Sequence, residues 1–136
     1  MQIDWKLKNG TLDGYVDPDD LLGEIRISHE ATLIQDEPIY LENWFNSLID
    51  GYEAMLSGKM GVLSSDLISE PDPLLFEFSD EGVVIAYKGR RLAVCNTQEF
   101  HKAIHTAAKR LVDLIITESP GKDRTALRKI EKFLRE

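Results

Sequence analysis

Two of the three histidines in this 136-residue chain lie four residues apart, at His101 and His105 in the stretch QEFHKAIH. Side chains at positions i and i+4 share one face of a helix, which is the geometry that two imidazoles need to bind one metal ion. The helical zinc-protease motif places a glutamate directly after its first histidine, but here Lys102 stands there. The only other histidine is the distant His29. These surroundings favour a histidine pair at a packing edge over a metal site, and we expect no cofactor.

The pair lies on one flank of a predicted helix over residues 97–118. At about 100° per residue, Val112 and Ile116 continue the same flank beyond the histidines, beside the main core stripe of the helix. This second, narrower apolar edge needs a cover. The last helix of the chain could supply it, and so could another protein, including a second copy of this chain in a homodimer.

A nucleophilic site is the alternative chemistry. Cys95 is the only cysteine, and it stands at a strand end directly before a predicted helix N-terminus, a setting that can favour a thiolate. No known nucleophile motif surrounds it, which favours a structural cysteine. The enzyme or ligand-binding hypothesis would place a pocket between sheet and helices, lined by Cys95, His101, His105 and either Tyr87 or Tyr52.

The formal net charge of −8 is unevenly distributed. Residues 1–58 hold 12 acids and 3 bases, whereas residues 97–136 hold 6 acids and 9 bases. The acidic half argues against nucleic-acid binding, because phosphates would be repelled. It suits a basic protein partner, although acidic surfaces also serve solubility alone. The acids that would form the docking surface are Asp13, Asp17, Asp19, Asp20, Glu24 and Glu30.

The composition, with 43% hydrophobic and 29% charged residues, is typical of a globular protein and predicts one domain over residues 1–136. No apolar run approaches the roughly 18 residues of a membrane span, and the first residues lack the pattern of a secretory signal. A single cysteine rules out an internal disulfide. We therefore expect a cytoplasmic protein that does not enter the membrane.

The elements that must position these residues follow from hydrophobic periodicity. Alternation predicts strands within residues 1–35: a first strand up to Leu7, an Asn9-Gly10 hairpin turn with a return strand over 11–16, and strands near 22–28 and 31–35. A period of 3.6 then predicts a helix over about 38–57, with Pro38 in its first turn and Gly58 at its end. Gly51 inside this helix suggests close packing against another element.

The second half repeats the order of strands followed by helix. Residues 58–73 lack a clear period and predict a loop with a short helical turn at 65–69, strands follow within 74–96, and helices follow at about 97–118 and 123–135. The whole predicts an α+β fold: an antiparallel meander sheet of about six to seven short strands, two long amphipathic helices on one face, and a short C-terminal helix.

Several stretches resemble those of small bacterial immunity proteins found in polymorphic toxin systems. They are the Trp44-Phe45 helix after a strand meander, the LLFEF and VVIAY strands, and the EFHKAI helix start on an acidic chain. The resemblance extends over residues 1–118. It implies a non-enzymatic inhibitor that binds a toxin domain by surface complementarity, and it transfers no site residue to this chain.

Overall fold

The chain adopts an α+β fold with two antiparallel sheets in the computed structural model, which describes residues 1–8 and 16–136. The first sheet has the order β1-β2-β3, formed by β1 (Gln2–Leu7), β2 (Leu22–His29) and β3 (Thr32–Tyr40). The second has the order β4-β5-β6-β7, formed by β4 (Gly61–Ser65), β5 (Leu74–Ser79), β6 (Gly82–Tyr87) and β7 (Arg90–Val94). The expected fold class is confirmed, but the strands form two sheets where the sequence suggested one meander.

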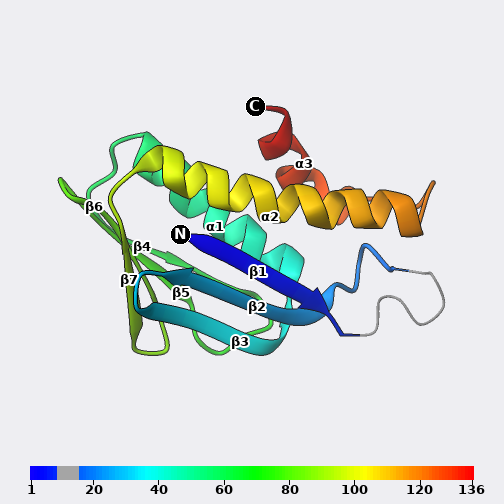
Figure 1. Ribbon diagram of the computed structural model, residues 1–136, viewed down its shortest axis with the longest axis horizontal. Helices are drawn as coiled ribbons and strands as arrows, with labels where there is room; N and C mark the ends of the chain where they lie inside the picture. The colour runs from blue at the N-terminus through cyan, green and yellow to red at the C-terminus, as the bar shows by residue number, and fades with distance from the viewer. Residues whose placement is uncertain (9–15) are drawn as a thin grey trace.

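Two long helices cover the same face of both sheets, as Figure 1 shows. They are α1 (Leu41–Leu56) and α2 (Thr97–Glu118); a 3₁₀ turn (Thr125–Leu127) and α3 (Arg128–Arg135) follow and lie on the far side of the two long helices. The bounds of α2 agree with the sequence prediction. Its start is fixed by Asn96, whose side-chain oxygen accepts hydrogen bonds from the backbone N–H groups of Gln98 and Glu99 at 2.8 and 3.3 Å.

The core lies between the helices and the inner faces of the sheets. Alternate strand residues point into it, so the buried positions of β2 and β5 recur with a period of two. The largest side chains without solvent exposure are aromatic and come from α1, β5 and α2: Trp44, Phe45, Phe76 and Phe100. Large rings of this kind contribute most of the apolar area that stabilises a domain of this size.

The junction between β3 and α1 corrects the sequence prediction. The strand expected to end at Gln35 continues to Tyr40, and the helix begins at Leu41 rather than near Pro38. The register between β2 and β3 shifts between Gly23 and Ile25, opposite Glu37 and Pro38. A β-bulge tolerates a proline because it does not require the missing N–H in the ladder. Pro38, predicted in the first turn of the helix, therefore lies at a β-bulge in β3 instead.

The segment over residues 58–73 also differs from its prediction, because residues 61–65 form β4 and residues 65–69 form no helical turn. The five-residue strand is too short, and too exposed on its outer face, to show a period in the sequence. Gly58 does end α1, with φ at +81°. The predicted Asn9-Gly10 turn and most of its return strand lie outside the described residues, and β1 pairs directly with β2.

Gly51 brings α1 against the four-stranded sheet at close range. A Cβ at this position would lie 2.2 Å from Cε1 of Phe76, well inside van der Waals contact. Both residues are buried, and the ring belongs to the central part of β5. The close packing expected from the sequence is therefore present, and it depends on the absence of a side chain.

We predict that Gly51→Ala destabilises the protein by roughly 1–3 kcal/mol, because the overpacking outweighs the gain of about 1 kcal/mol in helix propensity. Urea unfolding followed by circular dichroism measures the change. Phe76→Leu made in the Gly51→Ala background should cost less than Phe76→Leu alone, because it relieves the clash. A Gly51→Ala variant as stable as the parent protein would contradict this account of the contact.

Candidate functional site

The histidine pair lies under the last helix of the chain. The imidazoles of His101 and His105 stack with centroids 5.6 Å apart and an interplanar angle of 27°. Phe133 of α3 lies 4.9 Å from the ring of His101 and 6.4 Å from that of His105. Tyr52 of α1 closes the other side, at 5.3 Å from His101. The four rings form an aromatic cluster that joins all three helices.

The flank beyond the histidines is covered in part by the chain itself. Val112 is buried, whereas Ile116 keeps 43% of its surface exposed. Phe133 is itself 4% exposed, as expected of a residue that packs into a groove between two helices. A homodimer formed through this flank, as the sequence suggested, could use Ile116 for contact but not the buried Val112.

Among the described residues, no third metal ligand accompanies the histidine pair. His29, at the end of β2, bonds instead to Glu99, with Nδ1 at 3.2 Å from the carboxylate. Across residues 1–8 and 16–136, no group of three or more His, Cys, Asp or Glu side chains is arranged to hold a metal ion. What the described geometry supports for His101 and His105 is therefore aromatic packing.

The groups of the enzyme hypothesis do not converge. Cys95 is exposed at the end of β7, and within the described chain no hydrogen bond joins its Sγ to His101. Tyr87 is buried, and its hydroxyl donates to Asp36 of β3 at 2.5 Å. Burial, followed by this hydrogen bond, raises the pKa of Tyr87 well above its ordinary range. Tyr87 thus links the two sheets and does not face a cavity together with Cys95.

An open cleft of about 450 Å³ does lie beside the aromatic cluster, among the three helices rather than between sheet and helices. It includes Tyr52 and His101 but none of the other residues of the enzyme hypothesis. Its walls come from the end of α1 and from α3 as well: Tyr52, Glu53, Leu56, Ser57, His101, Phe133 and Glu136. Tyr52 and His101 share no hydrogen bond in the described structure, so their presence on one open wall does not make a catalytic arrangement.

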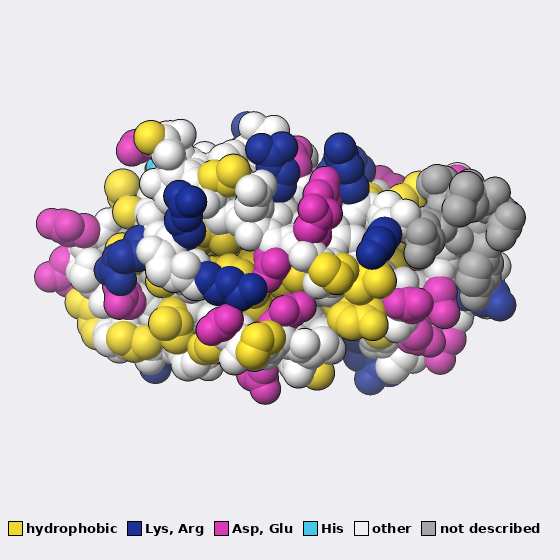
Figure 2. Space-filling model, turned by 90° about the horizontal axis from the view of Figure 1, so that it is seen from below, with side chains coloured by type: hydrophobic (Ala, Val, Ile, Leu, Met, Phe, Trp, Pro, Cys, Tyr) yellow, Lys and Arg dark blue, Asp and Glu magenta, His cyan; other side chains and the backbone are white. Residues whose placement is uncertain are grey.

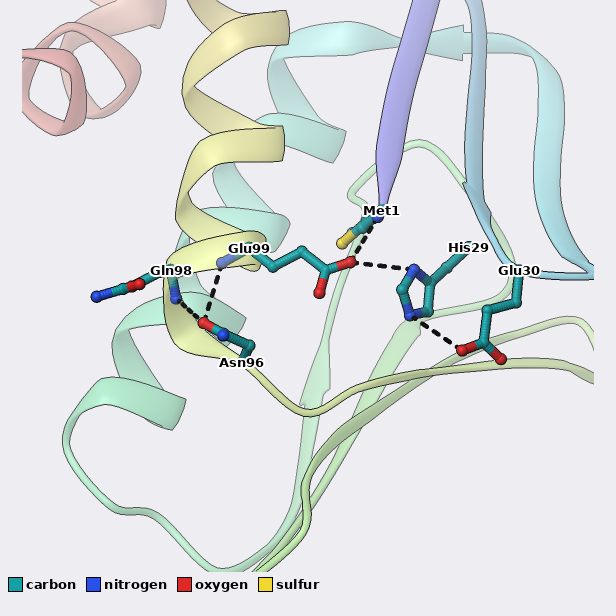
Figure 3. A network of polar contacts seen from close by, with 6 residues as sticks. All are labelled: Met1, His29, Glu30, Asn96, Gln98 and Glu99. Carbon is teal, nitrogen blue, oxygen red and sulfur yellow. Dashed lines mark hydrogen bonds and ion pairs between the residues drawn. The ribbon is translucent and has the colours of Figure 1, made fainter.

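A polar network fixes the start of α2 against β1 and β2, as Figure 3 shows. Glu99 accepts a hydrogen bond from the amino group of Met1 at 2.6 Å and contacts His29 through the same oxygen. The hydrogen bond from Met1 is the main reason that the pKa of Glu99 lies below its ordinary value, and the charges of Met1 and His29 act in the same direction.

The acids predicted to bind a partner fall into separate places. Asp19 and Asp20 are exposed in the segment before β2, next to Asp17, which accepts a hydrogen bond from the backbone N–H of Asp19 at 2.9 Å. Glu42, in the first turn of α1, joins them. We call these four residues the acidic corner: Asp17, Asp19, Asp20 and Glu42.

The pKa of Glu42 is affected both by its burial and by the other charges of the acidic corner. Burial raises the pKa of its carboxyl, and the negative charges of Asp20 and Asp19 raise it further, against hydrogen bonds from the backbone of Glu42 and Leu21. Its Oε2 atom is buried without a hydrogen-bond partner among the described residues. The one signal for Glu42 in the sequence is that it is an acid in the first turn of a helix; its closeness to the aspartates depends on how the helix docks.

The remaining predicted acids lie elsewhere. Glu24 contacts Lys6 across β1 and β2 at 3.9 Å. Glu30 is exposed in the turn between β2 and β3, at φ +55°, and β2 separates it from the acidic corner by roughly 25 Å at about 3.3 Å per residue. Asp13 lies outside the described residues. Figure 2 shows acidic and basic side chains interspersed across this face of the molecule.

Comparison of the chain with models of protein families, with curated proteins and with solved structures found no match in any of the three. None of the helices in the described chain has the length and apolar character to cross a bilayer.

We predict that Phe133→Ala destabilises the protein by about 3 kcal/mol and loosens α3, because the ring fills the groove over the two histidines. Denaturant unfolding gives the loss of stability, and faster proteolysis within residues 119–136 reports the loosening. Lys132→Ala, at the neighbouring exposed position, should change neither. If Phe133→Ala left proteolysis unchanged, α3 would not depend on this contact.

The lowered pKa of Glu99 predicts a pH-dependent stability. A carboxylate with a depressed pKa in the folded state contributes stability above its unfolded pKa of about 4.3, and this contribution is lost as the pH falls through the folded pKa. Glu99→Gln should therefore lower the thermal midpoint at neutral pH, and the difference from the parent should close in acid. Glu81→Gln is the control, because the exposed Glu81 side chain has no ion pair with a described residue. A difference that persisted unchanged into strong acid would contradict this assignment.

Proposed function

We propose that this protein is a non-enzymatic, cytoplasmic protein-interaction module that binds a basic partner through the acidic corner. The observation that carries the proposal is that Asp19 and Asp20 are exposed beside Glu42, whose pKa is raised mainly by burial and further by repulsion from these two aspartates. A basic partner would relieve this repulsion. The same surface would also steer the partner during association, which raises the association rate more than it increases affinity.

The resemblance to immunity proteins of polymorphic toxin systems supplies the proposed biological role, which is inhibition of a toxin domain by surface complementarity. Exposed carboxylates can cover a cationic substrate-binding surface without any chemistry of their own. The dispersed positions of Cys95, Tyr87 and His101 are consistent with a protein that acts by binding. A toxin gene next to the gene for this chain would support the role.

The experiment begins by isolating the partner from the native host and measuring its affinity for the pure protein. Asp19→Lys/Asp20→Lys should weaken binding by about tenfold or more, mainly through slower association, and added salt should weaken the parent complex. Asp80→Lys/Glu81→Lys is the matched control, since it makes the same change in net charge at two exposed acids in the turn between β5 and β6. Equal effects of the two variants, or an affinity independent of salt, would overturn the proposal.

A further inference from the structure

The edge strands of the two sheets differ in how far other elements of the chain cover them. The edge strand β1 is covered by α2. The indole Nε1 of Trp5 donates to the carbonyl oxygen of Ala107 at 2.9 Å. Arg110 donates to the carbonyl oxygen of Trp5 and lies over its ring at 4.4 Å. These contacts occupy the outward side of β1, so another strand cannot add there without displacing α2.

The second and third edges, β3 and β7, lie next to each other where the two sheets meet. Asp36 on β3 accepts a hydrogen bond from the hydroxyl of Tyr87, at the end of β6, at 2.5 Å. It accepts a second from Nζ of Lys88, in the turn between β6 and β7, at 3.2 Å. Each of these two edges therefore faces the other sheet rather than solvent.

The fourth edge, β4, pairs with β5 and with no other described strand. On its other side, no backbone group of residues 61–65 bonds to a described backbone group outside that ladder, and its one side-chain bond runs from Ser65 to Ser47 at 2.7 Å. The sequence of β4, GVLSS, contains no charge and no proline. Charged residues and prolines are the features by which solvated edge strands normally avoid pairing with another chain, and β4 has neither.

Exposed hydrophobic side chains gather around the same strand. Five large hydrophobic residues in the described chain are strongly exposed, and four of them precede, belong to or follow β4: Leu56 at 62%, Met60 at 57%, Val62 at 60% and Ile68 at 75%. On the outer face, Val62 and Val84 lie on either side of Glu77, which forms an ion pair with Arg91 of β7. Figure 2 shows hydrophobic side chains at the end where Figure 1 places this sheet. An unpaired edge with an apolar border is the pattern of an interaction surface.

We infer that β4 is a dimerisation strand, which pairs antiparallel with β4 of a second copy of this chain. The charges that flank β4 favour a second copy of the chain as the partner strand. Lys59 precedes the strand and Asp66 follows it, so a two-fold axis at Leu63 brings Lys59 of one copy to the same end of the pair as Asp66 of the other, one residue apart in register. The same axis places Val62 opposite Ser64 of the second copy, with no charge between the two edges. The result is one continuous eight-stranded sheet.

The test uses like charges that the proposed pairing brings face to face. Sedimentation of the unaltered protein from micromolar to near-millimolar concentration should show a dimer that dissociates on dilution. Val62→Lys/Ser64→Lys places lysines directly opposite each other and should raise the dissociation constant by about tenfold or more. Both positions are exposed, so the monomer should fold normally, as circular dichroism would verify. Ile116→Lys/Thr117→Lys adds the same charge at exposed positions on α2 and should leave the dimer intact.

Two further measurements identify the strand. Val62→Glu/Ser64→Glu should also be monomeric, but its equimolar mixture with the lysine variant should dimerise, because opposite charges then face each other. In an antiparallel strand alternate backbone amides point to each side, so dimerisation should slow hydrogen exchange at the β4 amides that do not bond to β5. A monomer at every concentration, a dimer that survives the lysine substitutions, or protection of β4 only on addition of a different protein would each overturn the proposal.

Discussion

The packing of α1 against both sheets is the constraint on which the rest of the structure depends. This helix contacts β2 and β3 of one sheet, β4 and β5 of the other, and both remaining helices. Its buried side carries Trp44 and Phe45, and Gly51 allows the ring of Phe76 to approach the helix backbone. Because two separate sheets share one cover, the position of α1 sets the angle at which they meet and the place where β3 and β7 lie side by side.

Residues that could do chemistry are used here for packing. The spacing of His101 and His105 is suitable for a metal, yet their rings stack on each other and against Phe133. An imidazole is flat and partly apolar, so it can fill the edge of an aromatic cluster while its nitrogens remain near solvent. Tyr87 similarly uses its ring in the core, edge-on to Trp44 at 4.8 Å, and its hydroxyl to hold the other sheet. Residue type and spacing alone do not separate these uses.

The two surfaces proposed for binding lie at opposite ends of α1. Glu42 of the acidic corner is in its first turn, and Leu56 beside the β4 edge is in its last, so about 20 Å of helix separates them at 1.5 Å per residue. Pairing through β4 would therefore leave both acidic corners of a dimer accessible. The charged outer face around Asp4 and Arg26 in the first sheet contrasts with the uncharged edge strand β4 in the second. This contrast gives the molecule two chemically distinct ends.

The sequence by itself determined the elements whose signals are local. The period of 3.6 predicted α2 with its observed bounds, and alternation predicted strands within residues 74–96, where β5, β6 and β7 lie. These signals succeed because helix and strand periodicity depend on neighbouring residues. A local signal was misleading at Pro38, where chemistry suited to a first helical turn serves a β-bulge instead.

Only the tertiary structure decided which elements meet. It divided the strands into two sheets, gave the histidine flank its cover from α3, placed Glu42 beside Asp19 and Asp20, and left β4 as the open edge. Each of these outcomes joins residues far apart in the chain, and it depends on the volumes and edges that remain after α1 has docked. No short-range pattern encodes such contacts, because the free energy that selects them comes from burial shared among several elements.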